Sequence, residues 1–119
     1  MNNFMCFVLT FFTTIIRKAT SHIAVILQNY VDHSYAGTQN SSGDDQLHLD
    51  IDCDNAVFRA IREAGVFAIA ASEETPEEVD VSPKTTKVDG PSFSLGFDPL
   101  DGSSIIDANF SVGSIFGIW

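Results

Sequence analysis

Acidic residues are distributed very unevenly along this chain of 119 residues, and that pattern restricts how the chain can fold. The first 31 residues contain no Asp or Glu, whereas all sixteen acids lie between Asp32 and Asp107. An apolar beginning without acids suits packing, so we expect the polar chemistry in the acidic remainder. With 45% hydrophobic residues, the chain has the size and apolar content of one globular domain.

The overall charge excludes two classes of partner. A formal net charge of −10 would be repelled by nucleic acids and by anionic membrane surfaces, so we expect neither as a partner. Cations are the better candidates for binding partners of so acidic a chain. The two cysteines, Cys6 and Cys53, match no metal-ligand spacing and no redox pair, which indicates free thiols in an intracellular protein.

The segment from Phe4 to Ile16 is almost wholly apolar or Thr. Its thirteen residues are too few for a transmembrane helix, which needs roughly 20. A signal-peptide core fits the length, but no Lys or Arg precedes the run, and Arg17 and Lys18 follow it. We therefore expect residues 1–14 to form a buried or poorly ordered apolar leader, with a targeting signal as the alternative, and residues 15–119 to belong to one domain.

Helices are predicted in the first half of the chain. Thr14 to Val31 has a broad apolar face typical of a helix, and the polar stretch from His33 to Gly43 predicts a surface loop. A second helix is expected to begin near Asp50 and Asp52, because acids favour the positive end of the helix dipole. Gly65 is expected to end this helix as a left-handed cap.

Strands are predicted in the second half. Val66 to Ala71 is a short apolar run typical of a buried strand, and Thr75 to Pro91 predicts a long loop. Phe93 to Phe97 predicts the next strand, which Pro99 should break. The alternation from Ser111 to Trp119 predicts a final strand. Helices and strands in this order indicate an α/β fold.

The segment from Phe97 to Ser104 has the most informative composition. Pro99 and Gly102 favour a sharp turn, which would bring Asp98 and Asp101 within about 7 Å of each other. Two carboxylates with the Leu100 carbonyl between them offer the hard oxygen ligands that Mg²⁺ or Mn²⁺ prefers. The sequence thus predicts a divalent-metal site here.

The same segment predicts a phosphate site beside the metal. After the turn, the backbone N–H groups of Gly102, Ser103 and Ser104 would be unpaired, and such a cluster can hold a phosphate. The alternative for the whole segment is an ordinary Asx turn that caps a short helix.

Further acids precede this segment. Glu73 and Glu74 follow the predicted buried strand, where two charges are costly unless a cation neutralises them. Neighbouring strand residues point to opposite faces, so the pair would serve two metal positions; two exposed acids at a strand exit are the alternative. For Asp44 and Asp50, the residue type alone favours capping and solvation at least as much as a role in the site.

These residues together resemble a known family. The ordered set Asp50, Glu73-Glu74 and Asp98-Pro99-Leu100-Asp101-Gly102-Ser103 resembles the signature of the metal-dependent, lithium-sensitive phosphatases, which include inositol monophosphatases and class I fructose-1,6-bisphosphatases. The extension to the last residue is similar to the sugar bisphosphatases. Ile105, the Asp107-x-Asn109-Phe110 run and Trp119 are most similar to the sedoheptulose-specific members. The resemblance begins at about Ile15.

The resemblance implies a layered sandwich with N-terminal helices and a mixed sheet, and it implies Mg²⁺ or Mn²⁺ as cofactor. It implies that Asp50 and Glu74 orient the attacking water and that Asp44 lies on a loop closing over the site. It implies phosphate binding by Gly102, Ser103 and Ser104, with Asp101 also on the substrate side. The implied metal ligands are Glu73, Glu74, Asp98, the Leu100 carbonyl and Asp101.

The implied function is hydrolysis of the 1-phosphate of sedoheptulose-1,7-bisphosphate, with fructose-1,6-bisphosphate as the alternative substrate. Relative to the family we expect the C-terminal half to be absent, so an inactive metal- or phosphate-binding fragment is the non-enzymatic alternative. A full-length form is expected to be a homo-oligomer. His33 and Thr38 stand where plastid members carry a regulatory cysteine pair, which favours the cytoplasm over the plastid stroma.

Overall fold

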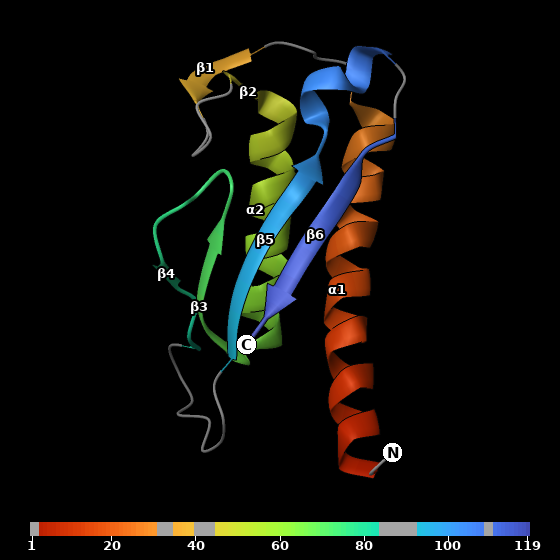
Figure 1. The fold of residues 1–119 in the computed structure, drawn as a ribbon, viewed down its shortest axis with the longest axis vertical. Helices are drawn as coiled ribbons and strands as arrows, with labels where there is room; N and C mark the ends of the chain where they lie inside the picture. Colours follow the sequence, from red (N-terminus) through yellow and green to blue (C-terminus); the bar gives the residue numbers. More distant parts are fainter. Residues whose placement is uncertain (1–2, 31–34, 40–44, 84–92, 109–110) are drawn as a thin grey trace.

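The computed structural model describes residues 3–30, 35–39, 45–83, 93–108 and 111–119. The expected α/β architecture is confirmed: two helices pack together against a mixed four-stranded sheet, and a small two-stranded sheet lies at one end (Figure 1). Among these described residues, no helix combines the length and the apolar character needed to cross a membrane.

Helix α1 spans Asn3–Asn29 and confirms the first predicted helix, but it begins well before the expected start at Thr14. It crosses the expected leader boundary without a break. The ring of Phe12 lies 4.8 Å from that of Phe93 and 5.9 Å from that of Phe67, measured between centroids. Within the apolar run, Phe12 and Ile15 pack on the core, whereas Leu9 and Phe11 are 51% and 38% exposed. The contacts of Phe12 and Ile15 favour the helix despite the modest helix propensity of Thr and Phe.

Helix α2 spans His48–Ala64, close to the predicted position. Its buried side carries Val57, Phe58 and Ile61, which pack toward the sheet. Gly65 ends the helix in the left-handed conformation, with φ 66° and its N–H donating to the Ile61 carbonyl at 3.2 Å. The predicted glycine cap is therefore confirmed.

Replacing this cap glycine tests the conformation directly. Gly65→Ala is expected to lower the free energy of unfolding by about 1–2 kcal/mol, because a Cβ disfavours the left-handed region. Crowding would add little, since the nearest atom to the added Cβ is Pro83 Cβ at 3.9 Å. Urea denaturation gives the difference, and Gly113→Ala, at a site with open space and no positive φ, is the control. Equal losses for both variants would contradict the assignment.

The main sheet has the strand order β4-β3-β5-β6. Strands β3 (Phe67–Ser72) and β5 (Phe93–Asp101) run parallel in the centre, while β4 (Val79–Asp80) and β6 (Gly113–Ile118) are antiparallel edges. Since parallel strands end at one edge of a sheet, the carboxyl ends of β3 and β5 meet, and α2 begins at that same edge (Figure 1). Buried Leu95 and Phe97 of β5 belong to the core between sheet and helices.

Two predicted loops contain strands. Strand β1 (Tyr35–Gln39) falls inside the stretch expected to be a loop, and it pairs antiparallel with β2 (Asp45–Leu47). Strand β4 falls inside the other expected loop, where Val79 pairs with Ala70 and Asp80 with Ile69. Both strands are short, and each is defined by hydrogen bonds to a partner strand, β2 for β1 and β3 for β4. Residue types alone do not reveal such pairing.

The expected break of β5 at Pro99 is wrong. The strand continues to Asp101, and Pro99 is buried within it. The pairing with β6 is irregular between Asp98 and Asp101, so the missing N–H of proline falls at a bulge where the ladder needs no donor. The Ser114 hydroxyl donates to the Pro99 carbonyl at 2.8 Å and satisfies that acceptor. The sharp change of direction comes later, at Gly102, whose φ is 87°.

Candidate active site

Asp50 lies in the first turn of α2 and is 97% buried, with an exposed fraction of 3%. Its Oδ2 accepts a hydrogen bond from the Leu47 N–H at 2.9 Å, so the capping interpretation is confirmed for this oxygen. Its Oδ1 is buried and has no hydrogen-bond partner among the described residues. One oxygen therefore stabilises the helix start, and the other is left for a further role.

The electrostatic surroundings of Asp50 connect it with the Asp98 segment. Burial raises the pKa of Asp50; the Leu47 amide and the Ser103 hydroxyl lower it, and the negative charge of Asp98 raises it. Asp98 from β5 and Ser103 from the segment after β5 thus both lie near enough to affect Asp50 on α2.

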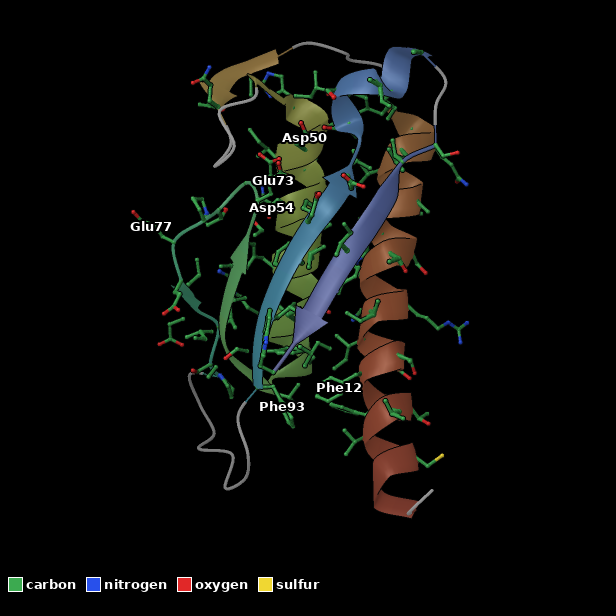
Figure 2. All side chains as sticks on the ribbon, in the orientation of Figure 1. Phe12, Asp50, Asp54, Glu73, Glu77 and Phe93 are labelled. Carbon is green, nitrogen blue, oxygen red and sulfur yellow. The ribbon has the colours of Figure 1, made fainter. Side chains whose placement is uncertain are left out.

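Glu73 and Asp98 follow paired positions of the two parallel strands. Ser72 pairs with Phe97, and the Glu73 N–H donates to the Phe97 carbonyl at 3.1 Å. Figure 2 shows Glu73 near Asp50 at the end of the molecule where β3 ends and α2 begins. Glu74 is the next residue, and both glutamates are partly buried and each engages in further interactions. The expected location of the pair at a strand end is confirmed.

The remaining residues of the predicted site lie on the same segment. Asp98 is partly buried, and its Oδ1 accepts from the Leu100 N–H at 3.0 Å, which is an Asx-type contact. Leu100 is buried and Asp101 is exposed at the end of β5. Because β5 stays extended across these residues, the tight turn expected between Asp98 and Asp101 is wrong.

A short 3-10 helix begins after this strand and carries the predicted phosphate ligands. Ser103 and Ser104 open this helix, which spans Ser103–Ala108, and the Ile105 N–H donates back to the Gly102 carbonyl at 3.2 Å. The first N–H groups of such a helix lack partners within it. A role of Gly102, Ser103 and Ser104 in phosphate binding stays a prediction. Asp44 lies outside the described residues, and so does Asn109.

The donors of the predicted metal site are of the type that a divalent cation takes. In the described part of the chain, no three Asp, Glu, His or Cys side chains are arranged to hold a metal ion. Carboxylates that share a site repel each other unless a cation is present. The unpartnered Oδ1 of Asp50, a carboxyl group whose pKa the charge of Asp98 raises, is the type of hard oxygen that Mg²⁺ or Mn²⁺ takes. The cofactor stays a prediction.

One residue of this region was not predicted from the sequence. Asp54, one helical turn after Asp50, has an exposed fraction of only 5%. Its Oδ1 accepts from the Ser72 hydroxyl at 2.5 Å and its Oδ2 from the Thr75 hydroxyl at 2.9 Å. Asp54 occupies a position on the apolar side of α2, and an acid there must be paired, which is the signal that could have identified it.

Cys53 lies between these two acids on α2 and is buried. Burial raises the pKa of its thiol from 9.0 to about 12, with smaller contributions from the negative charges of Asp50, Asp52 and Asp54. Because the thiolate is the reactive form, the burial and the raised pKa of Cys53 predict alkylation slower by orders of magnitude than for an exposed thiol.

Alkylation of the native chain with iodoacetamide, followed by peptide mass spectrometry, tests this prediction. Exposed Cys6 should be modified rapidly and Cys53 hardly at all. In urea the two thiols should react at similar rates, which serves as the control. Rapid modification of Cys53 in the native state would show that this side of α2 is open.

A groove between α1 and α2 is separate from the predicted site. It is lined by acidic, basic and apolar side chains, among them His22, Arg59 and Arg62, and it contains none of the predicted site residues. The guanidinium of Arg62 lies 5.2 Å from the centroid of the Phe58 ring. The acids at the ends of β3 and β5 therefore remain the candidate site.

Fold and site together define a layered α/β protein with acids gathered where two parallel strands end. The model for the N-terminal domain of fructose-1,6-bisphosphatase matches residues 2–119. The chain belongs to the fructose-1,6-bisphosphatase family, whose members are sugar bisphosphatases, that is, phosphoric monoester hydrolases.

Individual relatives come from both substrate branches. The chain is 50% identical over 88 residues to the chloroplastic sedoheptulose-1,7-bisphosphatase of Spinacia oleracea, covering 72% of this chain and 22% of that protein. It is 40% identical over 90 residues to the class 1 fructose-1,6-bisphosphatase of Campylobacter hominis, covering 76% and 30%. It is similar to the crystal structure of Leishmania major fructose-1,6-bisphosphatase in holo form, with TM-score 0.71, 31% identity, and coverage of 92% and 34%. The chain thus spans between a fifth and a third of the length of these proteins.

Proposed function

We propose that this chain takes part in hydrolysis of the 1-phosphate of sedoheptulose-1,7-bisphosphate, with Mg²⁺ or Mn²⁺ as cofactor. The observation that carries the proposal is the position of Asp50, Glu73 and Asp98 at the common edge where β3 and β5 end and α2 begins. The 50% identity to a sedoheptulose-1,7-bisphosphatase supports the substrate.

The proposed roles follow the resemblance. Glu73, Glu74, Asp98, the Leu100 carbonyl and Asp101 would hold the divalent ions. The chemistry that such ions supply is a lower pKa for the attacking water and neutralisation of the phosphate oxygens.

The other residues would act on water and phosphate directly. Asp50 and Glu74 would orient the attacking water, and the buried Oδ1 of Asp50 is available to accept its proton. The backbone N–H groups of Gly102, Ser103 and Ser104 would hold the 1-phosphate as it leaves.

Two alternatives have their own support. Fructose-1,6-bisphosphate is the second candidate substrate, favoured by the 40% identity to a class 1 fructose-1,6-bisphosphatase. Binding of a divalent metal or phosphate without turnover is the non-enzymatic candidate, since the match covers only 22% of the spinach sedoheptulose-1,7-bisphosphatase.

One experiment separates the three. The purified chain is incubated with Mg²⁺ and either bisphosphate, and release of inorganic phosphate is followed. Faster release from sedoheptulose-1,7-bisphosphate supports the proposal, and faster release from fructose-1,6-bisphosphate supports the other substrate. No release together with saturable Mn²⁺ binding supports the non-enzymatic candidate, and neither release nor binding contradicts the whole proposal.

Location and assembly are also proposals. The residues His33 and Thr38 favour the cytoplasm, whereas the name of the spinach relative favours the plastid stroma. Imaging of a fluorescently tagged chain in cells that contain plastids would distinguish the two. The homo-oligomer predicted for a full-length form can be tested by light scattering of that purified form.

A further inference from the structure

The two glutamates at the end of β3 lie on a turn that is closed by hydrogen bonds. The Ser72 N–H donates to the Thr75 carbonyl at 2.9 Å, and the Thr75 N–H donates to the Ser72 hydroxyl at 2.9 Å. These bonds join the two residues that flank Glu73 and Glu74. The Glu73 N–H also donates to β5 through the Phe97 carbonyl. The conformation of this turn therefore determines where both carboxylates can reach.

Asp54 contacts both ends of this turn from α2. Its Oδ1 accepts from the Ser72 hydroxyl at 2.5 Å, and its Oδ2 accepts from the Thr75 hydroxyl at 2.9 Å. Asp54 and Ser72 are both buried, so water does not compete for these bonds. Figure 2 shows Asp54 beside Glu73, at the same end of the molecule as Asp50. A single side chain thus connects the helix that carries Asp50 with the turn that carries the glutamates.

The chemistry of these contacts suits a carboxylate. Ser72 Oγ already accepts the Thr75 N–H, so its own proton is available for Asp54. Ionised aspartate is an acceptor only, with two oxygens in a fixed fork, and here each oxygen takes one hydroxyl proton. An asparagine has one acceptor oxygen and would present an amide donor to the other hydroxyl. The two hydrogen bonds therefore fix how far apart Ser72 and Thr75 lie and how the turn between them is oriented relative to α2.

Such an arrangement is not needed merely to attach α2 to β3. Burial raises the pKa of Asp54, and only the Ser72 and Thr75 hydroxyls and the charge of Arg62 act in the opposite direction. A buried charge costs free energy that an apolar contact would not. Helix α2 already packs on the sheet through Phe58, whose ring centroid lies 5.2 Å from that of Phe97 on β5, the strand paired with β3.

We propose that Asp54 is a positioning residue that holds the turn between Ser72 and Thr75, and thereby places Glu73 and Glu74 for metal binding. The proposal rests on the proposed function, because it assigns the turn to the predicted metal site. Asp54 acts through Ser72 and Thr75 and does not contact the metal or the substrate. Groups that support metal ligands in this way typically change metal affinity about 10- to 100-fold when they are removed.

The test uses the whole chain and two measurements. Mn²⁺ affinity is measured by electron paramagnetic resonance, and the amide resonances of Glu73 and Glu74 are followed by NMR without metal. Thr75→Val, which keeps the shape but removes the hydroxyl, and Asp54→Asn are expected to weaken Mn²⁺ binding about 10- to 100-fold and to shift both amides. Thr75→Ser should retain affinity, and Asp52→Asn, an exposed acid of the same helix, is the control.

Each outcome is decisive. Unchanged amides in Thr75→Val and Asp54→Asn would show that Asp54 does not hold the turn. Shifted amides with unchanged Mn²⁺ affinity would reduce Asp54 to a structural role and overturn the proposal. If Asp54→Asn does not fold, Thr75→Val and Thr75→Ser decide. A wild-type chain that binds no Mn²⁺ contradicts the proposed function itself, and the amide comparison then decides whether Asp54 holds the turn.

Discussion

Replacing Asp98 by Asn or Glu74 by Gln is expected to lower the affinity for Mn²⁺ at least about 100-fold and to abolish metal-dependent phosphate release. Both changes remove a proposed metal ligand while keeping its shape. Loss of a residue that only supports a ligand already costs about 10- to 100-fold, so loss of a ligand should reach or exceed the upper end of that range. Neither change should disturb the fold, since Asp98 and Glu74 are only partly buried.

Glu77→Gln is the matched control for this experiment. Glu77 lies three residues after Glu74, is exposed, and is directed away from Asp50 and Glu73 in Figure 2. Its replacement removes the same charge from the chain but should leave Mn²⁺ affinity and phosphate release unchanged. Equal losses for all three variants would indicate a general effect of net charge and not a specific metal site.

Phe67→Ala is expected to produce the largest loss of stability, about 3–5 kcal/mol. Phe67 has an exposed fraction of 1%, opens β3, and its ring contacts that of Phe12 from α1. Truncation removes its buried surface and leaves a cavity between helix and sheet that rigid neighbours cannot fill. Since domains are stable by only about 5–15 kcal/mol, the variant should approach the limit of folding.

Urea denaturation of Phe67→Ala and Phe11→Ala measures this effect. Phe11 is the same residue type on α1, is 38% exposed, and its ring packs edge-to-face against Phe12. Its replacement should cost about 1 kcal/mol, the value of one aromatic pair. If the two variants lose equal stability, the core lies elsewhere than between α1 and β3.

Elements with strong local patterns were predictable from the sequence. The apolar side of α2 and its glycine cap at Gly65 were both predicted and are confirmed. The strand positions of β3 and β6 were also predicted, because alternation and turn residues are local properties. On β6, Phe116 and Ile118 pack toward the core, while Ile115 is 58% exposed, as the alternation predicts.

Features that depend on tertiary contacts were not predictable. The break at Pro99 was wrong because the cost of a proline depends on whether the paired strand needs its N–H, and here the proline lies at a bulge. Strands β1 and β4 exist only through their partners β2 and β3. The early start of α1 depends on the packing of Phe12 against two strands that are distant in the sequence.

The candidate site likewise has some features that the sequence predicts and others that only the tertiary structure creates. The types and order of Asp50, Glu73 and Asp98 could be recognised in the sequence, and the structure places them at one edge of the sheet, while their roles stay predictions. Asp54 was missed because its function lies in two hydroxyl partners, Ser72 and Thr75, that only the fold brings to it. A buried acid in an apolar stripe indicates that a partner exists but not which one.

The central claim is that acids from α2, β3 and β5 form one site for a divalent cation. Titration of the isotopically labelled chain with Mn²⁺ tests it most directly, because the paramagnetic ion broadens the NMR signals of nearby nuclei. We expect the side-chain signals of Asp50, Glu73, Glu74 and Asp98 to broaden first and together. Broadening centred on other residues, or spread evenly over the acidic surface, would contradict the claim.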